Sequence, residues 1–173
     1  MSSSLYDTSI LPAKNALTAL AHIIRKGEEH SNGANFLTAA LIDDMKPLSF
    51  QILFSVSLAE KLVARTSGTP VPDSPTEVSS FAEAHALIEK ALKALNDADK
   101  TTIDNNAEKM VEVGMGPGVN IPMRTDSYAS AYSLPNIYFH VMTAYAILRK
   151  EGVPLGKMDY LSTFIGPYLP QKE

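Results

Sequence analysis

The sequence predicts an all-α protein, a four-helix bundle with a small β-hairpin between its third and fourth helices. Two observations support this prediction. Apolar residues recur at helical spacing in four long stretches, and one short Gly-rich segment lies between two partly alternating stretches. The chain has 173 residues, which is enough for one hydrophobic core, so we expect a single domain over residues 1–173.

The first two helices are predicted in the N-terminal part of the chain. The first runs from about Ser9 to His30, with a cap at residues 7–9 and with Pro12 in its first turn. The second runs from about Pro47 to Arg65 and begins at its proline. A Pro-rich surface loop over residues 67–75 follows it.

The third and fourth helices are predicted further along. Ser80 and Glu83 have the spacing of a capping box, and the third helix runs on to about Ala98. The fourth runs from about Asp126 to Lys150 and is apolar nearly all round, which is typical of a buried central helix. The tail beyond it is rich in aromatic residues, so we expect it to pack back on the bundle.

The hairpin is predicted from two short alternating stretches. Strands over residues 109–113 and 119–123 flank a five-residue loop, and Pro122 places its strand at an edge. No Lys-Ser or Lys-Thr pair follows the loop glycines, so they do not form a phosphate-binding loop.

Composition excludes several classes of function. A net charge of −4 with scattered basic residues argues against a nucleic-acid partner. The chain has no cysteine, which excludes disulfides and thiolate chemistry. No apolar run reaches membrane-spanning length, and the N-terminus lacks the pattern of a secretory signal, so we expect no membrane partner and a cytoplasmic protein.

The candidate functional residues lie on the fourth helix. Asn136 and His140 are four apart and share a helix face. Pro135 frees the Ala131 carbonyl and should bend the helix one turn before His140. Ligand sites in bundles are built between helices, so this face predicts a pocket for a small apolar organic molecule.

In this interpretation His140 acts as a catalytic acid or base and an amide orients the ligand. Asn136 or Gln51 supplies the amide, and Asp44 and Tyr132 are the other expected ligand-binding neighbours. The alternative is a core histidine bonded to a Ser, a Gln or a backbone carbonyl, in a non-catalytic protein.

Four segments carry a resemblance to a known family. They are residues 136–149, the run 152–157 with Asp159, the opening Leu5-Tyr6-Asp7, and residues 41–48 with Gln51. Together they resemble the uncharacterised family called domain of unknown function 1993. That family is similar to the DinB/YfiT superfamily, which implies a four-helix bundle, often dimeric and often metal-binding.

The metal site does not carry over residue by residue. The superfamily pattern has one His on the second helix and two, four apart, on the fourth. His140 falls on the later of those two, Asn136 falls on the earlier, and the second helix here has no His. Amides are weak ligands for zinc, nickel or iron, so we expect no metal and no cofactor. His22, His30 and His85 are interpreted as surface or boundary residues.

Three functions therefore remain open: a small-ligand pocket with His140 as acid or base, a non-catalytic dimeric bundle, and a DinB-like metal-dependent enzyme. We favour the first. We also expect a homodimer, because the fourth helix has more apolar faces than a bundle needs from one member, and because the resemblance implies one.

Overall fold

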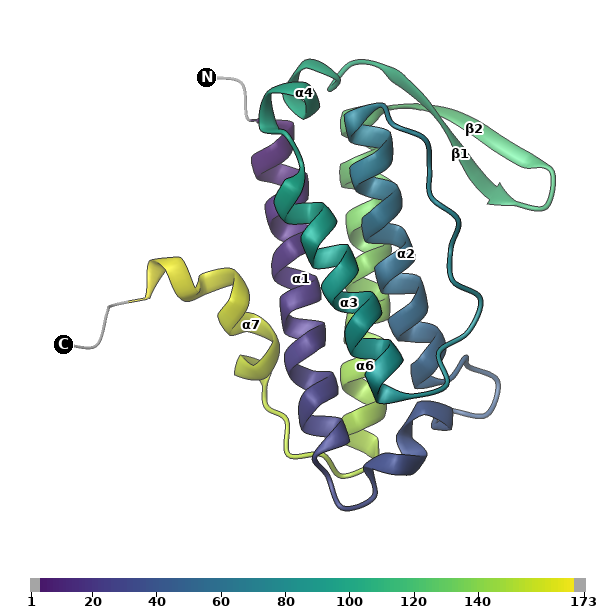
Figure 1. The fold of residues 1–173 in the computed structure, drawn as a ribbon, viewed down its shortest axis with the longest axis vertical. Coiled ribbons are helices and arrows are strands. Elements are labelled where there is room, and N and C mark those ends of the chain that lie inside the picture. The colour runs from purple at the N-terminus through teal and green to yellow at the C-terminus, as the bar shows by residue number, and fades with distance from the viewer. Residues whose placement is uncertain (1–3, 170–173) are drawn as a thin grey trace.

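Four long helices packed side by side form the body of the protein (Figure 1). The structure is a computed structural model and describes residues 4–169. The long helices are α1 (Leu5–Glu28), α2 (Leu48–Ser67), α3 (Phe81–Asp97) and α6 (Leu134–Lys150). The shorter ones are η1 (Gly33–Thr38), α4 (Lys100–Asn105), α5 (Thr125–Ser127), η2 (Tyr128–Ser133), α7 (Lys157–Ile165) and η3 (Gly166–Tyr168). The predicted four-helix bundle is confirmed.

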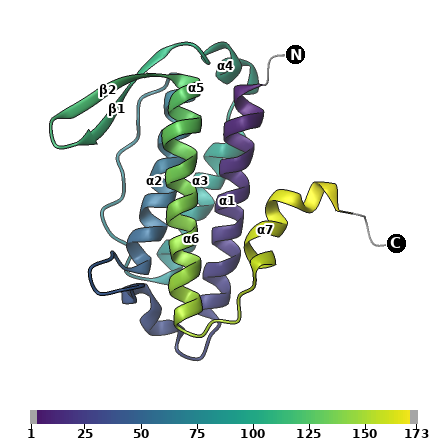
Figure 2. The same cartoon turned by 180° about the vertical axis from the view of Figure 1, so that it is seen from behind.

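The core lies where the apolar faces of the four helices meet. Figure 2 shows α6 between α2 and α1, with α3 behind them. Each long helix contributes side chains with no exposed surface: Leu17, Leu20 and Ile24 from α1, Ile52 and Leu62 from α2, Ala84 and Leu95 from α3, and Ile137 and Val141 from α6. Burying one such aliphatic side chain stabilises the fold by about 1.5–3 kcal/mol.

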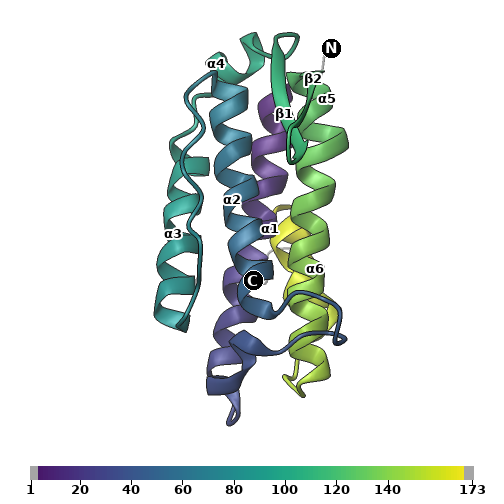
Figure 3. The ribbon, with the colours of Figure 1, turned by 90° about the vertical axis from the view of Figure 1, so that its right-hand side faces the viewer.

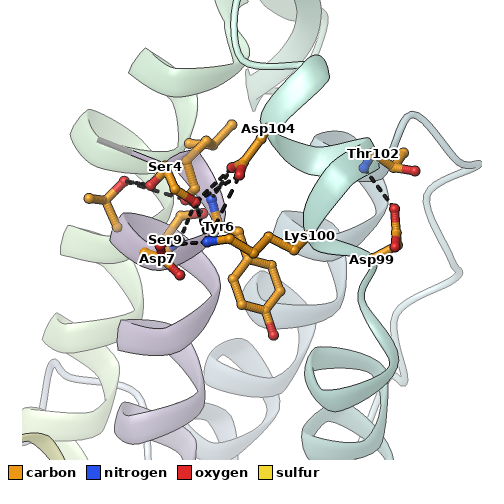
Figure 4. A network of polar contacts seen from close by, with 10 residues as sticks. Ser4, Tyr6, Asp7, Ser9, Asp99, Lys100, Thr102 and Asp104 are labelled. Atoms are coloured by element: carbon orange, nitrogen blue, oxygen red, sulfur yellow. Dashed lines mark hydrogen bonds and ion pairs between the residues drawn. The ribbon is translucent and has the colours of Figure 1, made fainter. Parts of the chain in front are cut away.

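Helix α1 begins earlier than its local sequence predicts. Ser4, not residues 7–9, is its cap, and the Ser4 hydroxyl accepts the Asp7 N–H at 3.2 Å. The Asp104 carboxylate of α4 accepts hydrogen bonds from the Ser4 hydroxyl and the Tyr6 N–H, each at 2.9 Å (Figure 4). This contact with a distant helix extends α1, so Pro12 lies inside the helix and not in its first turn.

The ends of α2 and α3 follow their predicted signals with one difference. Gly68 ends α2 with a φ of 73°, a conformation that glycine adopts at no steric cost. At the start of α3 the Ser80 hydroxyl accepts the Glu83 N–H at 3.2 Å, as predicted. The Glu83 carboxylate, however, accepts the N–H of Ser79 at 2.9 Å, so the capping box is not reciprocal.

The hairpin is confirmed, but its turn is tighter than predicted. Strand β1 (Met110–Gly116) pairs antiparallel with β2 (Val119–Arg124). The turn has two residues, Pro117 and Gly118, because Gly116 pairs directly with Val119. Gly116 and Gly118 have φ angles of 131° and 73°, which permit this tight reversal. In Figure 3 the hairpin lies between the ends of α2 and α6.

The predicted fourth helix is divided in its first half. Residues 128–133 form a π-helical segment, η2, and α6 begins immediately before Pro135. A proline cannot donate the normal helical hydrogen bond, and a wider turn ahead of it accommodates the missing donor. The helix is also less buried than predicted, since Phe139 is 57% exposed and Met142 is 40% exposed.

The first part of the aromatic tail packs against the bundle as predicted, whereas its end does not, since Tyr168 is 86% exposed and Leu169 is 45% exposed. Helix α7 lies beside α1 (Figure 1), and the Phe164 ring is 6.0 Å from the Tyr138 ring of α6. Asp159 Oδ1 lies 2.7 Å from His22 Nε2 and 3.0 Å from Lys26 Nζ. Partial burial alone would raise the pKa of the Asp159 carboxyl, but hydrogen bonds from the Gly156 N–H, His22 and Lys26 lower it to about 2. Within residues 4–169 no helix has the length and apolarity to cross a bilayer.

Candidate functional site

His140 and Gln51 meet in a buried hydrogen bond between α6 and α2. His140 is 8% exposed, and its Nδ1 lies 2.8 Å from Gln51 Oε1. The amide nitrogen of Gln51 donates to the Lys46 carbonyl at 2.9 Å. Because a carbonyl only accepts, this second bond orients the amide and directs its oxygen at the imidazole. Nδ1 of His140 therefore carries the proton, and Nε2 carries a lone pair in the neutral ring.

The second ring nitrogen of His140 is available for chemistry. Nε2 makes no hydrogen bond to any residue from 4 to 169. Among these residues, Ser133 Oγ is the only side-chain nitrogen or oxygen that is both inaccessible to solvent and without a hydrogen-bond partner. Because Nε2 has no partner, it must therefore be accessible to water. Burial lowers the pKa of His140 from 6.5, because it disfavours the charged ring. The neutral imidazole thus presents a base at neutral pH.

Three phenylalanine rings surround this histidine and form what we call the aromatic collar: Phe50, Phe54 and Phe139. Their ring centroids lie 6.1, 5.2 and 5.2 Å from that of His140. Phe50 and Phe54 stack on each other at 4.3 Å. Phe54 is 41% exposed, so the collar forms an apolar surface around a nearly buried polar group.

A cavity of about 500 Å³ lies beside the collar, between α2, the π-helical segment and the hairpin. Its walls come from four parts of the chain: Phe54, Ser57, Leu58, Lys61 and Arg65 of α2, Val113 to Gly116 of β1, Tyr132 of η2 and Asn136 of α6. The volume is in the range of small-molecule sites, and the walls mix apolar side chains with a few polar groups.

The structure divides the residues predicted from sequence between the cavity and the neighbouring His140–Gln51 pair. Asn136 and Tyr132 line the cavity, while His140 and Gln51 lie outside its walls. Phe54 links the two groups, because it both lines the cavity and packs against the His140 ring. Asp44 is not part of this arrangement: it lies exposed in the loop before α2.

Lys61 and Arg65 are the functional candidates that sequence reasoning missed. They lie one turn apart on α2 and both line the cavity. Arg65 donates to the Tyr128 hydroxyl at 3.1 Å and lies over its ring at 5.1 Å. Burial, and then the Arg65 charge, lower the pKa of Lys61. Their four-residue spacing was visible in the sequence, but only the position of the hairpin makes them cavity residues.

A larger cavity, of about 590 Å³, lies at the end of the bundle where α1 begins. The arginine in its wall, Arg124, is already paired with Asp126 at 2.7 Å and with Glu108 at 3.5 Å. None of the residues predicted from sequence lines it. We therefore place the candidate site at the smaller cavity beside the collar.

The residues around His140 do not suit a transition metal. The side chain that α2 presents to His140 is Gln51, and Asn136 lies one turn before it on α6. One imidazole and two amides make a weak donor set for zinc, nickel or iron. Over the described range, 4–169, no three His, Asp or Glu side chains gather closely enough to hold a metal ion.

The bundle, its hairpin and this α2–α6 face define a protein of the DinB-like class. A crystal structure of a DinB family member from Shewanella denitrificans is similar, with a TM-score of 0.82 and 27% sequence identity. The match covers 98% of this chain and 95% of that one. The chain belongs to the family described as domain of unknown function (DUF1993), which matches residues 5–161. No curated protein matches the chain.

Proposed function

We propose that this protein binds a small, largely apolar organic molecule in the cavity between α2, η2 and the hairpin, with His140 at its border. The observation that carries the proposal is the position of Phe54, which joins the cavity to the His140 ring. Asn136 and Tyr132 supply polar atoms in the wall and would orient the ligand.

His140 would act as the acid or base toward such a ligand. Its proton is held on Nδ1 by Gln51, so Nε2 can accept a proton or a hydrogen bond without a change of tautomer. The aromatic collar keeps the ring neutral by limiting its solvation. Contact between Nε2 and a ligand requires the ligand to extend past Phe54 from the cavity.

Binding is testable with the neutral dye N-phenylnaphthylamine, whose fluorescence rises in apolar surroundings. The Phe54→Ala variant should bind the dye about tenfold more weakly, because a cavity wall is lost. Phe139→Ala is the matched control: it removes another collar ring that does not line the cavity, and should leave the affinity unchanged. Equal losses in both variants, or no binding to the wild type, would contradict the proposal.

The proximity of His140 to the bound dye is a separate measurement. An NMR titration of the imidazole should give a lower pKa for His140 in the presence of the dye, because the dye displaces water from the ring. His22 and His85, which pair with Asp159 and Glu28 elsewhere on the molecule, serve as internal references. An unchanged His140 titration would mean that the ligand does not reach it.

The exposed apolar side chains of α2 and α6 also favour contact with a second copy of the chain. Phe54, Phe139 and Met142 are exposed apolar side chains, and such surface is normally covered by a partner. We propose a homodimer that buries the outer side of α6, in a protein of the cytoplasm. Cell fractionation tests the location, and light scattering tests the dimer.

A further inference from the structure

We infer that the cavity takes an organic anion, an apolar molecule that carries a carboxylate or sulfonate held between Lys61 and Arg65. The inference rests on the proposed function, since it names the chemical class of ligand for the same cavity. The inference is argued from a different observation than the proposed function: two cations line one side of a cavity whose other walls are mainly apolar.

The two cations lack a carboxylate partner. Within residues 4–169, neither Lys61 nor Arg65 lies within ion-pair distance of an Asp or Glu side chain. Glu60, the nearest acid along the chain, is paired with Lys90 at 2.9 Å, and its charge offsets only part of the lowering of the Lys61 pKa by burial and by Arg65. In a chain with a net charge of −4, two neighbouring cations without an acidic partner form a local site that attracts anions.

Arg65 is held in position while most of its donors stay free. One of its terminal nitrogens donates to the Tyr128 hydroxyl at 3.1 Å, and the guanidinium lies over the fully buried Tyr128 ring. A guanidinium has five N–H donors, and this bond uses one of them. The remaining donors form a fork that suits a planar carboxylate or a sulfonate.

Lys61 adds a second charge one turn away. Like charges four residues apart repel each other, and the lowered pKa of Lys61 is consistent with burial and with the nearby Arg65 charge. An anion between the two groups would remove that repulsion and replace lost hydration. Asn136 across the cavity can donate a further hydrogen bond, while Phe54 and Leu58 contact the apolar part of the ligand.

A pair of dyes separates charge from apolar burial. Anilinonaphthalene sulfonate has the same ring skeleton as N-phenylnaphthylamine, with a sulfonate added. We expect the sulfonated dye to bind the wild type about tenfold more tightly than the neutral one, because charged hydrogen bonds add to the same apolar contact. Titration by fluorescence at two salt concentrations should show the difference narrowing as salt rises.

The variants Lys61→Met and Arg65→Met keep an apolar stem and remove the charge. Each should weaken binding of the sulfonated dye about tenfold and weaken binding of the neutral dye much less, because methionine keeps an apolar wall. The matched control is Lys93→Met, which removes an exposed lysine of α3 that does not line the cavity. Circular dichroism melting checks that each variant is folded. Tyr128→Phe should give a smaller loss, since it frees Arg65 without removing its charge.

The possible outcomes are distinct. Binding of both dyes with equal affinity, and no effect of Lys61→Met or Arg65→Met, would overturn the anion assignment and leave the proposed cavity intact. Equal weakening by Lys93→Met would mean attraction by overall charge and would also overturn it. Failure of both dyes to bind would contradict the proposed function itself.

Discussion

The Asp104 cluster and the His140–Gln51 pair are two polar groupings that join helices distant in sequence, and they differ in how completely their atoms are paired. Asp104 accepts hydrogen bonds from Ser4 and Tyr6, and Lys100 Nζ donates to the Ser4 hydroxyl at 2.7 Å (Figure 4). His140 is paired at Nδ1 only. In the first grouping both carboxylate oxygens of Asp104 are paired, whereas the second has an imidazole nitrogen without a protein partner beside an apolar collar.

The comparison distinguishes a structural anchor, a polar network that holds helices together, from a functional site, which keeps a polar atom available to a ligand. A polar network whose members satisfy one another contributes to stability, and its loss should appear in unfolding experiments. A network in which one polar atom has no hydrogen-bond partner stabilises the fold less than a fully paired one. The unpaired atom remains available to bind a ligand or to transfer a proton. The following experiments test whether the two regions behave in these two ways.

The largest effect is expected from Gln51→Leu. The substitution leaves the buried Nδ1–H of His140 and the Lys46 carbonyl without their partner. We expect a loss of about 2–3 kcal/mol in the free energy of unfolding, measured by urea denaturation. The double variant Gln51→Leu with His140→Phe should recover about 1 kcal/mol, because both polar partners are then absent. No recovery would mean that the pair is not coupled.

A smaller effect is expected from Asp104→Asn. Asparagine keeps the shape of the side chain but removes the charge and replaces one of the two acceptor oxygens with a donor, so the Ser4 and Tyr6 bonds weaken and the start of α1 should loosen. The expected loss is about 1 kcal/mol, with hydrogen exchange increased at residues 5–9. Asp73→Asn, in the exposed loop before α3, is the control and should change little. Unchanged exchange at the start of α1 would refute the anchor role.

The two kinds of region should also respond to acid in different pH ranges. Burial lowers the pKa of His140 below 6.5, so the unfolded chain binds this proton more readily than the folded chain. The free energy of unfolding should therefore fall as the pH drops below 6.5, and His140→Phe should remove that part of the dependence. The difference between the two denaturation profiles isolates His140 from the other histidines.

The Asp159 carboxylate, which joins α7 to His22 and Lys26 of α1, should lose its contribution at lower pH. The pKa of Asp159 lies at about 2 in the folded chain, below its ordinary value of 3.8. Its stabilising contribution is present above pH 3.8 and is lost as the pH falls toward 2. Asp159→Asn should flatten the profile in this range only. A change that extended above pH 5 would contradict the assignment.

The smallest effect on stability is expected at the collar. Phe139 is 57% exposed, so Phe139→Ser should change the free energy of unfolding of the monomer by less than about 0.5 kcal/mol. If α6 lies in a homodimer interface, the same variant should shift the mass measured by light scattering toward the monomer value of 18.7 kDa. A wild-type mass of 18.7 kDa at micromolar concentration would contradict the dimer.

The sequence by itself determined the helices, the hairpin and the shared face of Asn136 and His140. These features depend on local spacing: apolar residues at a period of 3.6, the Ser80 cap and the Gly68 and Gly152 helix ends. The family resemblance over residues 41–48 with Gln51 placed that glutamine among the candidates, and the structure adds its bond to His140. Local patterns of this kind are readable because each depends on residues a few positions apart.

Only the tertiary structure decided which residues share a site. Ser4 caps α1 with the help of Asp104, which lies 100 positions away in the chain. Lys61 and Arg65 became cavity residues because the hairpin lies beside α2, and Asp44 was left outside because its loop remains exposed. Contacts of this kind depend on how whole helices and the hairpin pack against one another. No local pattern in a single sequence specifies that geometry.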